Sequence, residues 1–110
     1  MDGIIMREFS EKDWKLFRKK LPQWQEAYME RLCKEYVSLL TSNEKASERF
    51  WQLEKRIKKD RRKTGVVADM RRSVMIDNMV DLIIEGAITL EDLNDFSNDV
   101  KEAVRMIARL

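Results

Sequence analysis

The chain has 110 residues, of which 44% are hydrophobic and 38% are charged, and its formal net charge is +2. This size and apolar content are typical of one domain with one core, so we predict a single domain over 1–110, with 1–9 as a flexible N-terminal segment. The absence of histidine and the single cysteine exclude a Ser-His-Asp or Cys-His catalytic pair, a Cys/His zinc site and an internal disulfide.

Nothing in the sequence indicates a membrane segment. The longest stretch without a charged residue, 36–43, is far shorter than the roughly 18 apolar residues of a transmembrane helix. The first six residues lack the basic region of a secretory signal. Cys33, a lone thiol, fits a reducing cytosol, and we expect it to be a small buried helix residue. We therefore expect a cytoplasmic protein that does not contact a membrane.

Helix-favouring residues dominate the chain, and three Gly and one Pro leave little turn chemistry for a sheet. We predict an all-α fold, a compact bundle of four or five helices. Ser10 followed by Asp13 has the form of a helix N-cap and predicts a first helix over 11–20. Pro22 predicts a break or kink before a second helix over 22–40. The apolar positions of this second helix predict a broad buried stripe: Trp24, Tyr28, Met29, Leu32, Cys33, Tyr36, Val37 and Leu40.

The second half of the chain predicts three further helices. Capping residues over 41–43 precede a third helix that ends near residue 60. Its inner face is expected to hold Ala46, Phe50, Leu53 and Ile57, with Trp51 on the flank. A polar loop over 60–65 leads to a fourth helix that stops at Gly86, because glycine tolerates the left-handed conformation. Thr89 with Asp92 is a second cap-plus-acid start, for a fifth helix. The apolar residues expected on these last two helices are Val67, Met70, Val74, Met79, Leu82, Leu93, Phe96, Val100, Val104 and Ile107.

The large flexible and aromatic side chains have two interpretations each. Trp14, Trp24 and Trp51 are interpreted first as core anchors, and only an exposed tryptophan would indicate an interface hot spot. Four methionines are interpreted first as core filling and second as an adaptable docking groove: Met70, Met75, Met79 and Met106.

The net charge hides a segregated basic segment. Residues 55–72 hold two acids, Asp60 and Asp69, and nine bases: Lys55, Arg56, Lys58, Lys59, Arg61, Arg62, Lys63, Arg71 and Arg72. Such a cluster can contact a phosphate backbone, although no aromatic residue lies within it and no base-reading motif is present. The alternatives are a solvated or internally paired face, a nucleic-acid contact, and a contact with an acidic protein.

The following segment, 73–100, contains no base and seven acids. Six of them repeat at i+4 spacing and predict two acidic ridges, one on the fourth helix and one on the fifth: Asp77, Asp81 and Glu85, then Glu91, Asp95 and Asp99. Solvent exposure, a basic protein partner and pairing with the basic segment are the three interpretations. We expect the two charged segments to lie apart rather than to pair, because i+4 spacing favours a continuous exposed line.

Neither catalysis nor a cofactor is predicted. Paired carboxylates are common by chance in a chain with 20 acids, and no Gly-rich phosphate loop is present. The carboxylates lack the spacing of a calcium loop, so no metal site is expected. We therefore expect a protein that is not an enzyme.

A longer pattern lies between residues 48 and 104. It comprises ERFWQLEKRIK over 48–58, GVV over 65–67, MR over 70–71 and LIIEGAITLEDL over 82–93. This pattern resembles a family of short, uncharacterised all-helical proteins of bacteria, some of which carry the name multidrug transporter. The resemblance implies a bacterial setting and a helical shape, and the chain contradicts the transporter name because it has no membrane spans. Residues 86–93 are also similar to the helix-turn-helix hairpin of short oligomerisation domains.

Three functions follow as hypotheses. The first is a non-enzymatic bacterial regulatory or adaptor protein that binds another protein. In one version its acidic ridges imitate a phosphate backbone and inhibit a nucleic-acid-handling enzyme. The second is a nucleic-acid-binding protein that uses the basic segment 55–72. The third is a structural module in which the hairpin of the last two helices self-associates as a homodimer.

Overall fold

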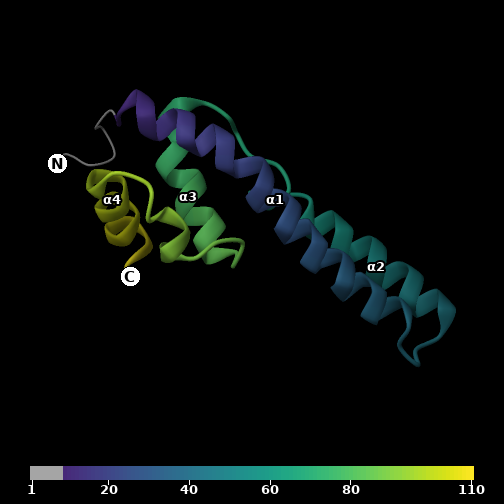
Figure 1. The fold of residues 1–110 in the computed structure, drawn as a ribbon. Coiled ribbons are helices and arrows are strands. Elements are labelled where there is room, and N and C mark those ends of the chain that lie inside the picture. Colours follow the sequence, from purple (N-terminus) through teal and green to yellow (C-terminus); the bar gives the residue numbers. More distant parts are fainter. Residues whose placement is uncertain (1–8) are drawn as a thin grey trace.

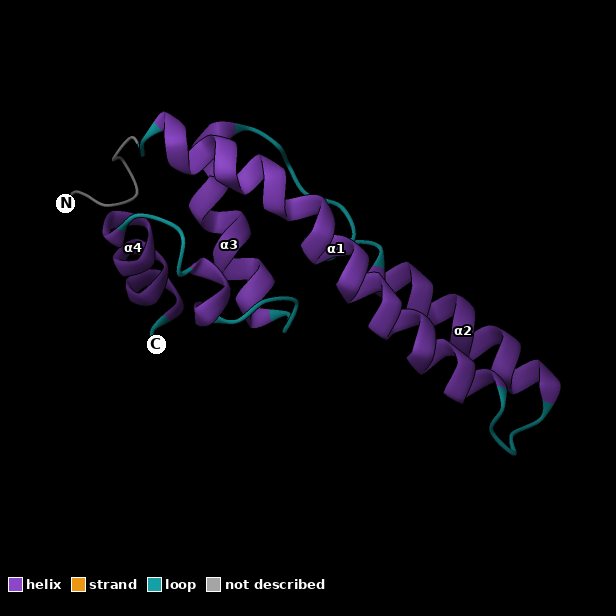
Figure 2. Ribbon diagram, viewed as in Figure 1, coloured by secondary structure: helices purple, strands orange, loops and turns teal. Residues whose placement is uncertain are grey.

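The computed structural model describes residues 9–110. The predicted all-α bundle is confirmed, because four α-helices pack together and the described residues contain no strand (Figure 1, Figure 2). The predicted flexible N-terminal segment lies outside the described residues, except for Phe9, which is half-buried against the core. In chain order the elements are α1 (Glu11–Leu40), α2 (Ala46–Asp60), the 3-10 helix η2 (Arg72–Val74), α3 (Met75–Ile84), the 3-10 helix η3 (Leu90–Leu93) and α4 (Asn98–Ala108).

Helix α1 is continuous over 30 residues and passes through Pro22. It begins where the sequence predicts, because the Ser10 hydroxyl accepts a hydrogen bond from the backbone N–H of Asp13 at 3.1 Å. The predicted division into helices over 11–20 and 22–40 is wrong. Pro22 lies on the exposed side of α1, where water can reach the Arg18 carbonyl that proline deprives of a donor, while Leu21 packs in the core.

The core lies at one end of the molecule, between the N-terminal half of α1 and the elements α3, η3 and α4 (Figure 1). The positions predicted for the core of the last two helices are confirmed at Met79, Leu82, Leu93, Phe96, Val100 and Val104. Met75 is also buried, so core filling is confirmed for Met75 and Met79. Core filling is wrong for Met70 and Met106, which are exposed. The core position predicted for Val67 is also wrong, because Val67 is exposed.

The last two helices are shorter than predicted. The fourth begins at Met75 rather than near Val67, because the Asp69 carboxylate accepts a hydrogen bond from the backbone N–H of Arg71 and the Asn78 side chain donates to the Asp69 carbonyl. It ends as predicted at Gly86, whose φ is 79°. Thr89 and Asp92 do form the predicted capping box. They start only the short η3, so the expectation of a single fifth helix from Thr89 is wrong.

Asp13 joins the starts of α1 and α4. It is buried, and its carboxylate accepts hydrogen bonds from the backbone N–H of Ser97 at 3.0 Å and from the Ser97 hydroxyl at 2.7 Å. The Ser10 hydroxyl donates to the same carboxylate at 2.9 Å. Ser97 in turn caps α4 by accepting from the backbone N–H of Val100. A single carboxylate therefore fixes where α4 begins against α1.

Asp13→Ala is expected to lower the free energy of unfolding by about 1–3 kcal/mol, because it removes the buried carboxylate that accepts hydrogen bonds from Ser97 and Ser10. Urea unfolding followed by circular dichroism measures this change. Glu102→Ala, which removes an exposed carboxylate from α4, is the control and should change stability by less than about 0.5 kcal/mol. Equal effects of the two variants would contradict the role given to Asp13.

Helix α2 runs antiparallel beside the C-terminal half of α1, and the two form a hairpin that projects from the core (Figure 1). The molecule measures 52 × 26 × 24 Å, and the hairpin accounts for the long dimension. Only two hydrophobic residues of the hairpin are buried, Tyr28 and Leu32. Because a pair of helices covers one side of each helix only, the rest of the hairpin surface stays exposed.

Candidate protein-binding surface

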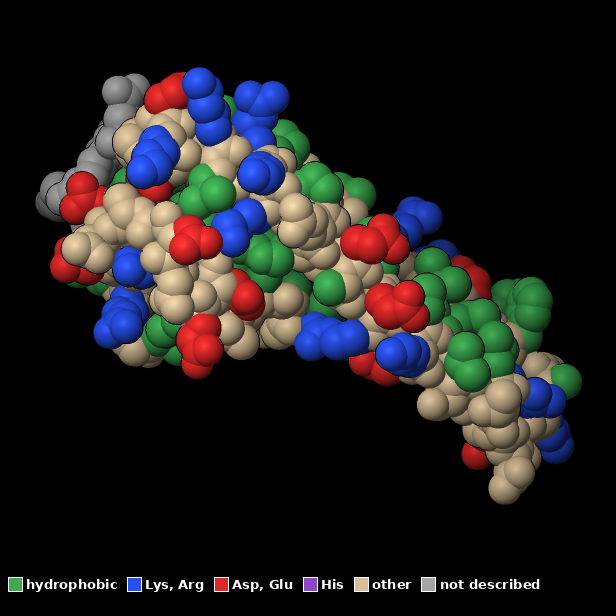
Figure 3. Space-filling model, viewed as in Figure 1, with side chains coloured by type: hydrophobic (Ala, Val, Ile, Leu, Met, Phe, Trp, Pro, Cys, Tyr) green, Lys and Arg blue, Asp and Glu red, His purple; other side chains and the backbone are tan. Residues whose placement is uncertain are grey.

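Large hydrophobic side chains are exposed on the hairpin, and we call them the hairpin patch. Its members and their exposed fractions are Val37 at 59%, Leu40 at 40%, Phe50 at 62%, Trp51 at 63% and Ile57 at 43%. Figure 3 shows hydrophobic side chains gathered over the outer part of the hairpin. Exposed apolar patches of this kind mark interaction sites in folded proteins.

The predictions that placed these residues in the core are wrong. The expected stripe of α1 is buried at Tyr28 and Leu32 and half-buried at Trp24, Met29 and Tyr36, but Val37, Leu40 and Cys33 are exposed. The expected inner face of α2 is half-buried only at Leu53. The physical reason is that α2 has a single neighbour, α1, and no third element covers the other side of the pair.

The members of the patch on the two helices lie on one face of the hairpin. In α1, Val37 and Leu40 each follow by one position the half-buried residues that face α2, Tyr36 and Leu39. In α2, Phe50 and Ile57 each follow by one position the half-buried residues Arg49 and Arg56, which face α1. One position is a turn of about 100° around a helix, and in an antiparallel pair this turn leads to the same side in both helices. The patch is therefore continuous across the pair.

Phe50 lies on this face, and Trp51, about 200° around α2 from Arg49, extends the patch onto the outer side of α2. Their ring centroids lie 4.9 Å apart and the rings are nearly perpendicular, at 82°, in the edge-to-face arrangement that aromatic rings favour. Beside Trp51 lies a shallow hollow of about 340 Å³ that is also lined by Ser47, Glu48, Gln52 and Lys55. Trp14 and Trp24 instead pack against the core, as predicted. Trp51 is thus the exposed tryptophan that indicates an interface hot spot.

A buried carboxylate holds the two helices of the hairpin together. Asp60 is 2% exposed, and its Oδ2 accepts hydrogen bonds from the Tyr36 hydroxyl at 2.7 Å and from Arg56 Nη2 at 3.3 Å. Its Oδ1 lies 3.6 Å from Lys63 Nζ. Arg56 also pairs with Glu35 of α1, at 2.7 Å. The seam between α1 and α2 is therefore polar, and its ion pairs fix how the patch is presented.

The titration of this seam follows from its geometry. Burial raises the pKa of Asp60, but the hydrogen bond from Tyr36 and the charges of Arg56 and Lys63 outweigh burial, so the pKa lies below its ordinary value. Burial, together with the bond to Asp60, raises the pKa of Tyr36 to about 12. At neutral pH Asp60 is therefore ionised and Tyr36 is protonated, so the hydrogen bond between them is kept.

The base of the hairpin is fixed by backbone contacts. The carboxylate of Glu85 accepts hydrogen bonds from the backbone N–H of Thr64 at 2.9 Å and from that of Gly65 at 3.0 Å. Gln25 Nε2 donates to the Thr64 carbonyl at 3.0 Å. The Tyr28 ring lies directly against Gly65. These contacts join the turn after α2 both to α1 and to the end of α3.

The two predicted acidic ridges have different outcomes. On α3, Asp77 and Asp81 are exposed, while Glu85 is half-buried against the turn after α2. Burial, and then the charges of Glu85 and Asp77, raise the pKa of Asp81. The second ridge is wrong as a helical row. Glu91 lies in η3, Asp95 lies in a loop and pairs with Lys20 at 3.3 Å, and Asp99 lies in α4.

The predicted basic segment is divided between paired and unpaired side chains. Its ion pairs are Arg56 and Lys63 with Asp60, Arg56 with Glu35, Lys58 with Glu54, Arg71 with Asp69 and Arg72 with Glu11. Within residues 9–110, Lys55, Lys59, Arg61 and Arg62 are exposed and make no ion pair. No ion pair in that range joins the 55–63 bases to the carboxylates of α3. The segments instead meet where the Glu85 carboxylate accepts hydrogen bonds from the backbone N–H groups of Thr64 and Gly65.

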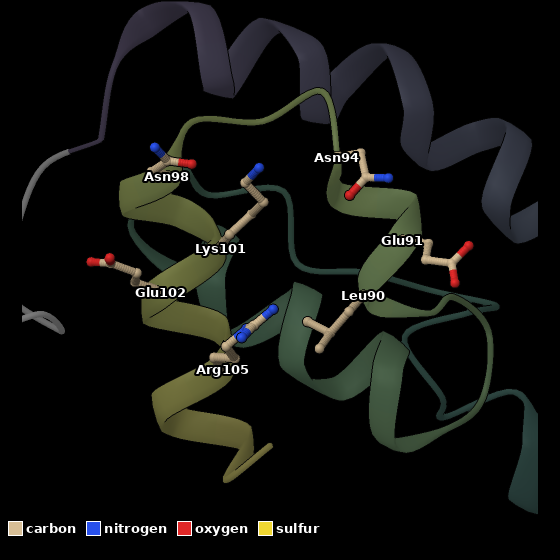
Figure 4. A pocket seen from close by; sticks show the side chains of 7 residues that line it. All are labelled: Leu90, Glu91, Asn94, Asn98, Lys101, Glu102 and Arg105. Atoms are coloured by element: carbon tan, nitrogen blue, oxygen red, sulfur yellow. The ribbon is translucent and has the colours of Figure 1, made fainter.

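A cleft of about 380 Å³ lies between η3 and α4 (Figure 4). It is lined by Leu90, Glu91, Asn94, Asn98, Lys101, Glu102 and Arg105. Two carboxylates and two cations line it, so their charges cancel and the cleft favours neither an anion nor a cation. In the part of the chain that the structure describes, no group of three or more acidic or cysteine side chains is arranged to hold a metal ion.

Comparison with protein-family models, with curated proteins and with solved structures finds no match for this chain. The family resemblance of residues 48–104 therefore stays a prediction. Among the described residues, no helix is both long enough and apolar enough to cross a membrane.

Proposed function

We propose that this protein is a non-enzymatic adaptor or regulatory protein of the bacterial cytoplasm, and that it binds another protein chain through the hairpin patch. The observation that carries the proposal is the pair Phe50 and Trp51, whose rings contact each other and are both more than 60% exposed. Exposed aromatic side chains in such a patch dominate the binding energy of protein interfaces. Burying them against a partner removes apolar area from water and stabilises the complex.

The charged surfaces support other functions less well. A carboxylate row that imitates a phosphate backbone needs its members side by side, whereas Glu85 is engaged by backbone amides and Asp95 by Lys20. A nucleic-acid contact would rely on the four unpaired bases of the basic segment, Lys55, Lys59, Arg61 and Arg62. Neither function uses the apolar area of the hairpin patch. For this reason we place the activity at the patch.

The experiment that tests the proposal is site-specific photocrosslinking. A photoreactive phenylalanine analogue replaces Trp51 in one sample, and the exposed Lys12 of α1 in a control sample. After irradiation in an extract of the source bacterium, position 51 should give discrete protein adducts that position 12 does not give. The same probe at position 51 in a Phe50→Ser chain should give far fewer of these adducts.

Two results would contradict the proposal. One is the same set of adducts from positions 51 and 12, since binding would then not depend on the patch. The other is the recovery of nucleic acid alone, in an amount that falls with rising salt and with Arg61→Glu/Arg62→Glu, as expected for phosphate contacts. Circular dichroism of each variant shows that the helices are retained.

A further inference from the structure

We propose that the partner of the hairpin patch is a second copy of this chain. Two hairpins pair with their tips together, α1 of each lying on α2 of the other, and close a four-helix bundle around a two-fold axis. The inference rests on the proposed function, because it names the partner of the same surface. It differs from the predicted self-association of the last two helices, whose apolar residues are largely buried in the core.

The heights of residues along the hairpin follow from its internal contacts. Gln25 of α1 bonds to Thr64, and Glu35 pairs with Arg56. A residue of α1 and a residue of α2 therefore lie at the same height along the hairpin when their residue numbers add up to about 90. Leu40 is then level with Phe50, near the tip, and Glu30 is level with the residues just after Lys59, at the base. A two-fold axis along the hairpin preserves these levels when it places α1 on α2 of the second copy.

This pairing matches apolar groups near the tip. Val37 and Leu40 present aliphatic side chains on the α1 side of the patch face, and Phe50 presents its ring on the α2 side, with the Trp51 ring packed against it. In a two-fold dimer Val37 and Leu40 of each copy meet Phe50 of the other, Trp51 flanks this contact, and each contact occurs twice. In the alternative dimer, α1 would lie on α1 and α2 on α2 of the second copy. The aromatic side chains would then contact only each other, and the aliphatic side chains only each other.

The same pairing matches charges near the base. Glu30 is exposed on α1. At about the same height, Lys58 in the last turn of α2 and Arg61 just after it are also exposed. Glu30 and Arg61 make no ion pair within the described part of the chain. Placing α1 on α2 of the second copy brings Glu30 of one copy toward Arg61 of the other. The charge pattern is therefore self-complementary about the proposed axis, which sets the orientation of the two copies.

The area of the patch suits a dimer of this kind. The five side chains of the hairpin patch expose roughly 500 Å² in one copy, because a whole aromatic side chain alone has about 150–250 Å². Two copies together supply about 1,000 Å² of apolar area, the lower limit for a specific interface, and the charged side chains beside the patch add to the buried area. The globular end does not obstruct the pairing, because α1 contacts it through Phe17 and Leu21, which lie on the same side of α1 as Leu32, away from the patch face.

The first test is the oligomeric state, measured by sedimentation velocity over a concentration series. Wild-type protein should form a dimer, and Phe50→Ser/Trp51→Ser should weaken it at least a hundredfold while the helix content stays unchanged. Lys59→Glu, an exposed reversal that lies on α2 away from the patch face, is the control and should leave the dimer intact. A wild-type monomer at high concentration, or a dimer that survives loss of both aromatic side chains, would overturn the inference.

The second test exchanges the charges of Glu30 and Arg61. If these residues only stabilised the fold, the double exchange would not restore the dimer. Glu30→Lys and Arg61→Glu should each weaken the dimer about tenfold, since each places like charges together at two symmetric contacts. The double variant Glu30→Lys/Arg61→Glu should restore most of the affinity. Additive weakening in the double variant would overturn the pairing of α1 with α2.

The third test is the position of the tips. In a Cys33→Ser background, Ser42→Cys in the turn between α1 and α2 should be crosslinked to its counterpart in the second copy by a short bismaleimide. A dimer without this crosslink overturns the tips-together arrangement. If the protein is a monomer that still gives specific adducts with another protein from position 51, this inference fails and the proposed function stands. If position 51 gives no specific adduct either, both fail.

Discussion

Asp60→Ala is expected to lower the free energy of unfolding by about 2–3 kcal/mol, because the buried carboxylate accepts hydrogen bonds from the Tyr36 hydroxyl and from charged Arg56. The substitution leaves Arg56 and Lys63 without their shared carboxylate and the Tyr36 hydroxyl without its acceptor. Urea unfolding monitored by circular dichroism measures the change. Glu54→Ala is the matched control, because Glu54 forms an ion pair with Lys58 on the surface of the same helix, at 3.1 Å.

The control should cost only about 0–1 kcal/mol, since exposed ion pairs contribute little. Two variants of equal stability would show that Asp60 does not hold the seam. The loss should also appear in hydrogen exchange as faster exchange along α2, with the core of α3 and α4 less affected. The hairpin depends on this carboxylate more than the globular end does, because its own apolar core is only Tyr28 and Leu32.

The contribution of Asp60 also depends on pH in a definite direction. Its pKa is lower in the folded than in the unfolded protein, so the unfolded chain binds the proton first as the pH falls. The stabilisation is therefore complete above the unfolded pKa of about 3.9, and it is lost as the pH falls through the lower folded value. The difference in stability between wild type and Asp60→Asn should be constant near neutral pH and shrink below about pH 4. A difference that grows on acidification would contradict this sign.

Gly65→Ala is expected to lower the free energy of unfolding by about 3 kcal/mol, at the upper end of overpacking costs. A Cβ at this position would lie 2.3 Å from Cδ2 of the Tyr28 ring, so the ring or the turn must shift. That shift also strains the hydrogen bond from the Gly65 backbone N–H to Glu85. Thermal or urea unfolding measures the loss.

A double-mutant cycle identifies the cause of this loss. In a Tyr28→Ala background, Gly65→Ala should cost far less than in the wild type, because the colliding ring is absent. Gly86→Ala is the comparison, since a Cβ there meets no atom within 4 Å. It should cost about 1 kcal/mol, owing to its positive φ alone. An unchanged cost of Gly65→Ala without the ring would show that collision is not the mechanism.

Local features of this protein follow from the sequence by itself. The N-cap of Ser10, the capping box of Thr89 and Asp92, and the stop at Gly86 are interactions between residues a few positions apart, so sequence spacing determines them. The burial of residues such as Met79 and Val104 also follows from spacing, because each apolar row in these short helices meets the core.

The interface of α2 with α1 was decided by the tertiary structure. Spacing shows that Phe50 and Ile57 share one side of α2, but it does not show which side meets α1. Asp60 and Arg56 occupy that side instead, because partners distant in sequence, Tyr36 and Glu35, compensate the cost of burying their charge. The apolar row then remains on the outside, where it forms the hairpin patch. Helical periodicity predicts which residues share one side of a helix. Only the position of the neighbouring helix determines whether that side is buried.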